Sequence, residues 1–311
     1  MKIVFCCTNT KAEPWLEGFR QALPGVDIWE WQAAQPGETP KLADHAVVWS
    51  PPQSFLDEQT QLQNLFNIGA GVDALLKLKM PASLNIVRLN DAGMSVQMAE
   101  YVCHAVIRYF REFDHYDKDA QAQRWSYRKP TLRAHFSVGI LGAGVLGSHV
   151  AKTLQAFEFP VNVWSRSPKH IEGVRSFSGA AQLPEFLKAT RVLVNLLPLT
   201  SETENILNRS NLMQLQKGAY LINVARGRHL VEQDLLDALA EGHMAGATLD
   251  VFREEPLPQA HAFWTHPQIT VTPHTSARTL REESIAQIAG KIKAVYAGQA
   301  IEGRVDKVRG Y

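Results

Sequence analysis

Short apolar runs alternate with longer amphipathic stretches along most of the chain. In the first third, the apolar runs predict β-strands at residues 3–7, 27–31, 46–49, 65–68 and 86–89. Turn residues such as Pro24-Gly25 and Pro51-Pro52 separate these runs. Strands that alternate with helical segments favour a parallel sheet whose strands are joined by crossover helices.

The stretch from residue 95 to residue 119 has a different pattern. Its apolar positions recur at helical spacing, at Val96, Ala99, Cys103, Val106, Phe110 and Phe113. This spacing predicts one long helix that connects two domains. The segment 124–133 that follows is polar, and because Pro130 cannot continue a helix, we expect a loop there.

The alternation of strands and helices resumes after His135. Strands are predicted at 136–141, 161–164, 191–196, 220–223, 245–249 and 269–272, with helices between most of them, including 145–157 and 232–241. A last amphipathic stretch, 280–296, predicts a helix that crosses back to the first domain. We therefore expect an α/β protein with two doubly wound, Rossmann-like domains. The first domain is discontinuous and is placed at 1–96 plus 279–311, and the second is placed at 97–278.

Composition narrows the functional classes. The 311 residues are 45% apolar and 20% charged, as in a soluble globular protein, and the formal net charge of +1 indicates neither nucleic acid nor an anionic membrane as a partner. No apolar run approaches the length of a membrane span, and the start of the chain resembles a first strand more than a secretory signal. The three cysteines form no disulfide framework. We expect a cytoplasmic protein, with Cys6 and Cys7 as a buried strand pair in preference to a redox pair.

A glycine-rich turn predicts the cofactor site. Gly142-Ala143-Gly144-Val145-Leu146-Gly147 has the spacing G-x-G-x-x-G and lies between a predicted strand and a predicted helix. Gly142 permits a tight turn, Gly144 lets a pyrophosphate approach the backbone, and Gly147 lets the helix pack close to the strand. The first N–H groups of that helix offer a site for phosphates. A glycine-rich turn without a ligand is the alternative.

The end of the next strand predicts which dinucleotide binds. An NAD site expects Asp or Glu there to hold the ribose hydroxyls, but the chain has Ser165-Arg166-Ser167-Pro168-Lys169. A carboxylate would repel a 2′-phosphate, whereas Arg166 can form charge-assisted hydrogen bonds with it. We therefore predict that NADPH is preferred over NADH, with Ser165, Arg166, Ser167 and Lys169 in the site. The alternative is that the two cations are ordinary surface charges.

Three residues farther along suggest the chemistry. Arg226, Asp250 and His274 each follow a predicted strand, and Glu255 lies between the last two. The planar fork of Arg226 matches the carboxylate of a 2-oxo acid, and His274 can supply a proton to the developing alkoxide. Glu255 is the candidate partner that orients the imidazole. Asp250 either contacts the nicotinamide carboxamide or supports local structure, and both roles stay open. The alternative is that these residues are structural, because a His after Pro and a Glu-Pro pair are each common in loops.

These motifs together resemble the D-isomer-specific 2-hydroxyacid dehydrogenases. The resemblance extends nearly from end to end. The segments that carry it are 139–147, 195–200 (Asn-Leu-Leu-Pro-Leu-Thr), 222–227 (Ile-Asn-Val-Ala-Arg-Gly) and 249–252 (Leu-Asp-Val-Phe). Trp49 beside Pro51-Pro52, Ala70-Gly71-Val72-Asp73, Trp164-Ser165-Arg166 and the final Arg309-Gly310-Tyr311 are similar to the branch that reduces glyoxylate and hydroxypyruvate. The Thr275-Ser276 that follows His274 departs from many members, which have small apolar residues there.

The resemblance implies several roles. The discontinuous domain, 1–96 plus 279–311, would be a flavodoxin-like substrate domain, and 97–278 would be the dinucleotide-binding Rossmann domain. Arg226 would bind substrate, His274 would be the acid/base and Glu255 its partner. Backbone groups around Ala70, Gly71 and Val72 would hold the substrate carboxylate, and Trp49 would close a small pocket, with a core aromatic at a strand end as the alternative. Leu197, Pro198, Val224, Ala225 and Asp250 would contact the cofactor. The family further implies a homodimer joined through the cofactor domains, with a cleft that closes on the substrate.

The expected activity is NADPH-dependent reduction of glyoxylate and hydroxypyruvate to glycolate and D-glycerate. A related dehydrogenase acting on a bulkier 2-oxo acid, or a nucleotide-sensing corepressor without enzymatic activity, is the alternative. No group of residues has metal-ligand spacing, so no metal is expected. The sequence does not rank glyoxylate against hydroxypyruvate, and it gives neither the physiological direction nor the interface of the dimer.

Overall fold

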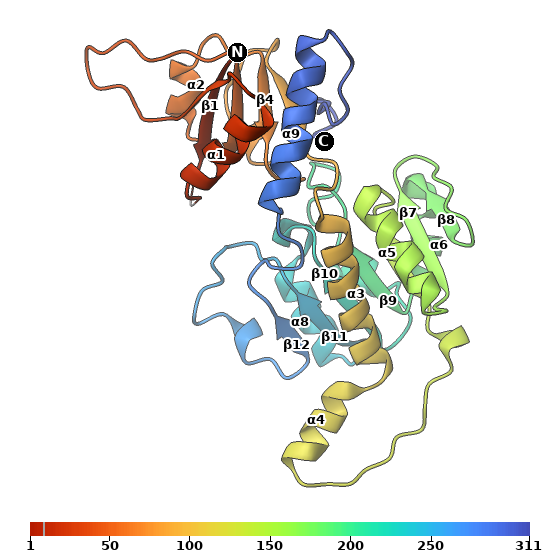
Figure 1. The fold of residues 1–311 in the computed structure, drawn as a ribbon. Coiled ribbons are helices and arrows are strands. Elements are labelled where there is room, and N and C mark those ends of the chain that lie inside the picture. The colour runs from red at the N-terminus through yellow and green to blue at the C-terminus, as the bar shows by residue number, and fades with distance from the viewer. Residues whose placement is uncertain (9) are drawn as a thin grey trace. The chain divides into compact units, whose positions relative to one another are not determined.

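The computed structural model describes residues 1–8 and 10–311. The chain divides into two compact units, one formed by Met1–Gly93 with Thr279–Tyr311 and the other by Met94–Arg278. Figure 1 shows each unit as a sheet flanked by helices. The substrate and cofactor roles that the sequence predicts for the two parts of the chain stay predictions at this point.

The first unit is built on a parallel sheet with the strand order β2-β1-β3-β4-β5. Its strands are β1 (Lys2–Cys7), β2 (Asp27–Glu30), β3 (His45–Trp49), β4 (Asn64–Asn67) and β5 (Asn85–Arg88). Its helices are α1 (Glu13–Ala22), α2 (Gln53–Glu58) and α9 (Arg281–Tyr296), with a 3-10 turn at Leu75–Lys77. This strand order is that of flavodoxin-like sheets.

Residues 279–311 join this unit through α9 and the chain end. Helix α9 packs against α1 so closely that a Cβ at Gly18 would lie 2.5 Å from Ile285 Cδ1. Beyond α9, the N–H of Arg88 donates to the carbonyl of Gly303 and the N–H of Val305 to that of Ile86, both at 2.9 Å. The returning segment therefore pairs with the backbone of edge strand β5.

The second unit is built on a larger parallel sheet with the order β12-β11-β10-β9-β6-β7-β8. Its strands are β6 (Val138–Leu141), β7 (Val161–Ser165), β8 (Arg175–Ser178), β9 (Val192–Asn195), β10 (Ala219–Asn223), β11 (Met244–Leu249) and β12 (Ile269–Val271). Its helices are α3 (Met94–Phe110), α4 (Phe113–Gln121), α5 (Val145–Ala156), α6 (Gly179–Lys188), α7 (Arg209–Leu212) and α8 (Glu232–Ala240). Shorter 3-10 turns lie at Arg133–His135, Gly227–His229 and Ala262–Trp264.

Two apolar layers enclose this second sheet. Along β10, Tyr220 and Ile222 belong to the layer that includes α3 and α5, whereas Leu221 belongs to the layer that includes α6 and α8. Successive residues of a strand face opposite sides, so a strand buried on both faces is apolar throughout. The prediction of a doubly wound α/β fold is confirmed.

One local prediction is wrong, and one strand was not predicted. Residues 95–119 do not form one helix, because α3 ends at Phe110 and Glu112 adopts a left-handed φ of 54° before α4 begins. Ion pairs from Arg108 to Asp114 and Asp117, both 2.6 Å long, hold the two helices across this break. Strand β8 was not predicted, since its sequence Arg-Ser-Phe-Ser buries only one side chain at a sheet edge.

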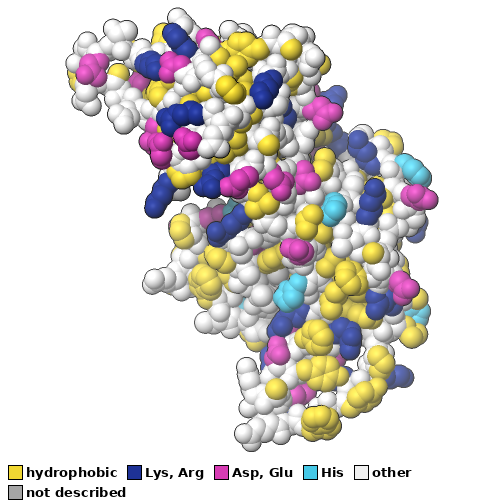
Figure 2. Space-filling model, viewed as in Figure 1, with side chains coloured by type: hydrophobic (Ala, Val, Ile, Leu, Met, Phe, Trp, Pro, Cys, Tyr) yellow, Lys and Arg dark blue, Asp and Glu magenta, His cyan; other side chains and the backbone are white. Residues whose placement is uncertain are grey.

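The segment around α4 carries apolar side chains on its surface. Figure 2 shows hydrophobic atoms gathered over α4 and the chain that follows it. The side chains of Phe113, Trp125, Tyr127 and Leu132 are all exposed there, and Trp125 is fully so. In the part of the chain that the structure describes, no helix has the length and apolar character needed to cross a membrane.

The three cysteines are free thiols. Cys6 and Cys7 lie on β1, and burial raises the pKa of Cys6 to about 12 and that of Cys7 even further. Burial also raises the pKa of Cys103, on α3, to about 11. Because the thiolate is the reactive form, the raised pKa values argue against a redox role for Cys6 and Cys7. Of the predicted buried pair, Cys6 is buried and Cys7 is half-buried.

Candidate active site

Three predicted site residues lie beyond the carboxyl ends of three neighbouring strands. Arg226 follows β10, Asp250 follows β11 and His274 follows β12. These strands are parallel and adjacent, so their carboxyl ends share one edge of the sheet. Ligands of doubly wound sheets bind beyond this edge.

His274 and Glu255 form a close pair. His274 Nδ1 lies 2.7 Å from Glu255 Oε2, and Glu255 Oε1 accepts the N–H of Phe252 at 2.9 Å. Partial burial raises the pKa of Glu255, but the bonds to His274 and Phe252 and the charges of His274 and Arg226 outweigh it and lower the pKa below its ordinary value. An ionised carboxylate can only accept, so Nδ1 carries a proton. Nε2 of this imidazole, whose side chain is 46% exposed, is left for proton transfer.

Asp250 holds the loop that carries His274. The backbone of His274 has a φ of 51°, an uncommon conformation for a residue other than glycine. Its N–H donates to the Asp250 carbonyl at 2.8 Å. The fully buried carboxylate of Asp250 accepts the N–H groups of Thr275 and Ser276, both at 2.8 Å, and the hydroxyl of Thr272 at 2.6 Å. Of the two roles left open for Asp250, these bonds support local structure.

Tyr101 on α3 extends this network. Its hydroxyl lies 2.5 Å from Thr272 Oγ1, which already donates its single proton to Asp250. Tyr101 is therefore the donor in that pair. Burial raises the pKa of Tyr101 to about 12, so the phenol keeps its proton. The helix thus braces the His274 loop through a chain of two hydroxyl groups.

Arg226 reaches the same region because two loops cross tightly. A Cβ at Gly227 would lie 1.8 Å from the carbonyl carbon of Phe252, so only glycine allows this crossing. The crossing brings Arg226 near the segment 252–255, where its charge helps to lower the pKa of Glu255. One of its nitrogens, Nη1, donates to the Ala225 carbonyl at 2.8 Å. A guanidinium carries five donors in a planar fork that suits a carboxylate.

A cavity of about 410 Å³ lies beside the His274–Glu255 pair. It is lined by Phe252, Glu255, Pro256, Leu257, Trp264, Val271, Pro273 and His274. Its walls are apolar except for one carboxylate and one imidazole. Charge interactions are stronger in such surroundings than in water, and apolar walls with a few polar groups are typical of small-molecule sites.

The glycine turn between β6 and α5 fits a dinucleotide. Gly142 has a φ of 107°, and a Cβ there would lie 2.8 Å from the Leu196 carbonyl oxygen. A Cβ at Gly147 would lie 1.8 Å from the Gly142 carbonyl oxygen. A Cβ at Gly144, by contrast, would meet no atom of the described residues within 4 Å, apart from those of its chain neighbours. The described part of the chain thus leaves the space over Gly144 open, as expected where a pyrophosphate approaches the backbone.

The position of this turn in the sheet supports the same interpretation. Strand β6 lies between β7 and β9, where the strand order reverses direction, and ligands bind at such a switch point. Helix α5 begins at Val145 after Gly144. Val145 is exposed, Leu146 is half-buried and Ala143 is buried. The first N–H groups of α5 can therefore receive phosphate oxygens.

The segment after β7 lies next to this turn. The N–H of Gly142 donates to the Trp164 carbonyl at 2.8 Å, and Ser165 Oγ donates to the Ser167 carbonyl at 2.8 Å. Arg166 and Lys169 are exposed, and Arg166 Nη1 lies 3.8 Å from Glu202 Oε2, a long and solvated ion pair. The pair is weak enough to be exchanged for a phosphate.

The other predicted cofactor residues follow β9 and β10. The side chains of Leu197, Val224 and Ala225 are buried, whereas Pro198 is exposed. The Pro198 carbonyl accepts the hydroxyl of Thr203 at 2.7 Å. Leu197, Val224 and Ala225 can therefore offer a ligand mainly their backbone atoms.

In the first unit, Trp49 and the segment 70–72 lie at the carboxyl ends of two neighbouring strands, β3 and β4. Trp49 ends β3, and its ring covers Gly69, where a Cβ would lie 2.2 Å from Trp49 Cζ3. With 37% of its surface exposed, Trp49 is no core aromatic. Asn67 Nδ2 donates to the carbonyls of Gly69 and Gly71, both at 2.9 Å, and shapes the loop. Val72 is buried, so it can contribute only backbone.

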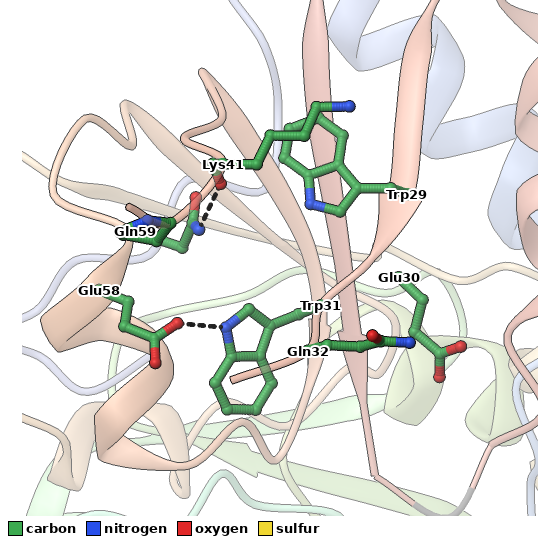
Figure 3. Close-up of a pocket in the computed structure, with 8 residues that line it drawn as sticks. Trp29, Glu30, Trp31, Gln32, Lys41, Glu58 and Gln59 are labelled. Atoms are coloured by element: carbon green, nitrogen blue, oxygen red, sulfur yellow. Dashed lines mark hydrogen bonds between the residues drawn. The ribbon is translucent and has the colours of Figure 1, made fainter. Parts of the chain in front are cut away.

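A smaller cavity of about 200 Å³ also lies in the first unit, between the end of β2 and the end of α2 (Figure 3). Trp31 Nε1 donates to Glu58 at 2.9 Å. The Lys41 ammonium lies 3.8 Å from the ring centroid of Trp29 and 2.8 Å from an oxygen of Asp27. The cavity contains no predicted site residue, and its Lys41 and Glu58 are engaged locally, so we assign it no role.

Several residues that hold the site were missed by sequence reasoning. Tyr101, Thr272 and Asn67 are examples, as are the buried Asn195, Asn223 and His229. The one available signal was an Asn at the end of an apolar run, as in Val192-Leu193-Val194-Asn195. Across residues 1–8 and 10–311, no group of three or more His, Cys, Asp or Glu side chains could hold a metal ion.

Comparison with known proteins identifies relatives of this chain. The family model "D-isomer specific 2-hydroxyacid dehydrogenase, NAD binding domain" matches residues 103–276. The glyoxylate/hydroxypyruvate reductase A of Serratia proteamaculans is 50% identical over 317 aligned positions that cover 100% of both chains.

Solved structures agree with the sequence match. A D-isomer specific 2-hydroxyacid dehydrogenase from Xanthobacter autotrophicus Py2, in complex with NADPH and MES, has a TM-score of 0.93 and 37% identity, covering 100% of this chain and 99% of that one. The NADPH-dependent glyoxylate/hydroxypyruvate reductase from Sinorhizobium meliloti, in complex with NADP and sulfate, has a TM-score of 0.92 and 33% identity with the same coverage.

Proposed function

The chain belongs to the D-isomer specific 2-hydroxyacid dehydrogenase family, as its motifs predicted, and on that premise we propose that it reduces glyoxylate and hydroxypyruvate to glycolate and D-glycerate with NADPH. One observation carries the proposal. The His274–Glu255 pair lies at the same sheet edge as Arg226, whose charge acts on Glu255. A cation for a carboxylate and an imidazole with one proton-exchanging nitrogen are what reduction of a 2-oxo acid requires.

Each residue of this group has a distinct role in the proposal. Arg226 binds the carboxylate of the substrate through its planar fork. NADPH, when bound, supplies the hydride that reduces C2. His274 Nε2 then gives a proton to the oxygen on which negative charge develops, while Glu255 keeps Nδ1 protonated and the ring oriented. Asp250 fixes the loop in which His274 lies.

The remaining assignments follow the family. Backbone groups of Ala70, Gly71 and Val72 bind the substrate carboxylate, and Trp49 limits substrate size. The glycine turn 142–147 would hold the pyrophosphate, and the segment 165–169 would hold the 2′-phosphate that distinguishes NADPH from NADH. The absence of an acidic residue after β7 supports this preference, because a carboxylate there would repel the phosphate.

A panel of substrates tests the proposal. The purified chain is assayed for NADPH oxidation with glyoxylate, hydroxypyruvate and bulkier 2-oxo acids, and each assay is repeated with NADH. We expect the highest kcat/KM with the two small substrates and NADPH. A higher kcat/KM with a bulky 2-oxo acid would indicate a related dehydrogenase. NADPH binding without turnover on any of them would favour a nucleotide-sensing corepressor.

We also propose that the protein is a homodimer joined through its cofactor domains and that it resides in the cytoplasm. The exposed apolar side chains of the α4 segment, with Trp125 and Tyr127 the most exposed, support an association surface there. The three free thiols are compatible with a reducing compartment. Light scattering of the wild type and of Trp125→Ser tests the first point: dimers that persist in the variant with unchanged affinity would place the interface elsewhere. Cell fractionation tests the second.

A further inference from the structure

Three polar side chains are completely buried behind the edge of the sheet that carries Arg226. Asn195 ends β9, Asn223 ends β10, and His229 lies in the 3-10 turn that follows Arg226; all three have a solvent exposure of 0%. Asn195 Nδ2 lies 2.9 Å from both Asn223 Oδ1 and His229 Nδ1. The three side chains therefore form one hydrogen-bonded network.

Backbone groups fix which way each amide of this network points. The N–H of Leu197 donates to Asn195 Oδ1 at 3.3 Å, so the Nδ2 of Asn195 must face His229. The N–H of Ala225 donates to Asn223 Oδ1 at 3.4 Å, while Asn223 Nδ2 donates to the Arg226 carbonyl at 3.2 Å. Each amide is thus oriented by a main-chain donor.

This orientation fixes the protonation of His229. Its Nδ1 faces a donor and must accept, whereas its Nε2 lies 3.2 Å from the Pro198 carbonyl oxygen and must donate. Only the neutral imidazole with its proton on Nε2 meets both requirements. An imidazolium would set its Nδ1–H against the N–H group of Asn195. His229 therefore differs from His274, because its Nδ1 accepts a hydrogen bond whereas the Nδ1 of His274 carries a proton.

We infer that His229 is a positioning residue of the reaction: as a neutral Nε2–H imidazole it fixes the Pro198 carbonyl and, through Asn195 and Asn223, the backbone of Arg226. The Arg226 carbonyl accepts both Asn223 Nδ2 and the N–H of His229, each at 3.2 Å. The network thus joins a predicted cofactor residue to the predicted substrate-binding residue. The link between these contacts and the reaction rests on the proposed function.

The first unit contains a matched pair that serves as a control. His45 and Asn64 begin β3 and β4, are 2% and 3% exposed, and place Nδ1 and Nδ2 3.2 Å apart. The pair is therefore a buried imidazole–amide contact at the amino ends of strands, whereas the predicted site residues follow carboxyl ends. Loss of His45 should affect folding alone.

The experiment compares His229→Leu, His229→Gln and His45→Leu in the full-length chain. Each is measured for thermal stability, for the Kd of NADPH by fluorescence titration, and for kcat and KM with glyoxylate. We expect His229→Leu to raise both the KM and the Kd by about tenfold, since small displacements of positioning groups weaken binding steeply. His229→Gln, which keeps an N–H donor, should recover part of the loss. His45→Leu should lower Tm with the Kd and the KM unchanged.

A second measurement reports directly on the imidazole. ¹⁵N spectra of the histidine side chains, with His229→Gln to assign the signal, should show the neutral Nε2–H tautomer in the wild-type protein. The opposite tautomer, an imidazolium, or an unchanged KM and Kd in His229→Leu would overturn the inference. If the wild type does not reduce glyoxylate, the proposed function fails, while the spectra and the NADPH titration still decide the role of His229. If His229→Leu does not fold, the spectra and His229→Gln decide it.

Discussion

The two sheets present different kinds of groups at their carboxyl edges. In the second unit, β10 and β12 are followed by ionisable side chains, Arg226 and His274. In the first unit, β3 ends in the apolar Trp49, and β4 is followed by a loop in which Gly69 and Gly71 carry no side chain. One edge presents a guanidinium and an imidazole, and the other presents backbone groups and the face of an indole ring.

The two edges are also held in place differently. Buried polar groups fix the second edge, since the Asp250 carboxylate binds the His274 loop and the Asn195 network binds the Arg226 loop. Packing and an amide side chain fix the edge in the first unit. The Trp49 ring packs directly against Gly69, and Asn67 donates hydrogen bonds to two backbone carbonyls. Groups that transfer protons or bind charge need exact orientation, whereas an apolar side chain that limits the size of a pocket needs only the right shape. Changes at the second edge should therefore have the larger effects.

The largest effect is expected at His274. His274→Gln keeps a polar side chain of similar size but removes the proton donor, and general acids of this kind contribute about 10²–10⁴-fold to rate. We expect kcat to fall by that factor, with the Kd of NADPH unchanged in a fluorescence titration. A kcat within twofold of the wild type would remove His274 as the acid and with it the distinction between the two edges.

A comparable loss, exerted through substrate binding, is expected at Arg226. Arg226→Ala removes the planar fork, and two charge-assisted bonds of about 1.5–3 kcal/mol each make a loss of roughly hundredfold or more in kcat/KM reasonable. Steady-state kinetics with glyoxylate should show the loss mainly in KM. Arg226→Lys is the matched control, and it should recover only part of the activity because it keeps the charge without the fork. A change confined to the Kd of NADPH would show that the role is misassigned.

Arg166 tests the cofactor side of the second unit. Arg166→Ala removes one cation from the segment after β7, at a cost of about 1.5–3 kcal/mol for a bond to a phosphate. We expect the KM for NADPH to rise about tenfold to hundredfold, with the KM for NADH nearly constant. Lys169→Ala, in the same segment, shows whether the second cation shares the role. Equal effects on NADPH and NADH would contradict a 2′-phosphate site.

Much of this arrangement followed from the sequence, because apolar runs mark strands and strand ends mark the edge of a sheet. Arg226, Asp250 and His274 were found in that way. Their supports were not, since a buried polar residue is explained by its partner, and the partners are distant in sequence: Asn195 lies 34 residues from His229, and Tyr101 lies 171 residues from Thr272. The periodicity of apolar residues indicates which positions are buried, but it does not indicate which residues form hydrogen bonds with each other.

The fold class was predicted correctly, but two local features were missed for the same reason. The break after Phe110 depends on a single left-handed residue, Glu112, inside a stretch whose apolar spacing continues without interruption. Strand β8 is held by its pairing with β7 and has no apolar run of its own. In both places the local pattern is ambiguous, and the contacts that decide the structure lie elsewhere in the chain.

At the edge of the first unit, a moderate effect is expected. A Cβ in Gly69→Ala would meet Trp49 Cζ3 at 2.2 Å and must displace the ring, while Trp49→Ala removes it. If Trp49 acts as a wall, both variants should lose about tenfold in preference for glyoxylate over a bulkier 2-oxo acid, the range for one apolar contact in a pocket. The ratio of kcat/KM for glyoxylate to kcat/KM for the bulkier substrate measures this preference. Unchanged ratios in both variants would restrict Trp49 to a structural role.

The smallest effect concerns the pH dependence of stability at Glu255. The hydrogen bonds and positive charges around this carboxylate outweigh burial and lower its pKa below the ordinary 4.5. Folding therefore favours the ionised form, so the stabilisation is fully present above about pH 4.5 and is lost as pH falls through the lower folded pKa. Because the side chain is 36% exposed, solvent screening limits the contribution to at most about 1 kcal/mol.

Thermal unfolding of the wild type and of Glu255→Gln between about pH 3.5 and 7 measures this contribution. The difference in Tm should be constant at the higher pH values and shrink below pH 4.5. The exposed Glu254→Gln, which removes a carboxylate from the same segment, should not reproduce it. In a His274→Gln background the difference should be smaller, because the bond and the charge of His274 are gone while the Phe252 N–H and the charge of Arg226 remain. A difference that grows as the pH falls would mean that the imidazole does not hold Glu255 ionised, and the contrast between the two edges would then rest on Arg226 alone.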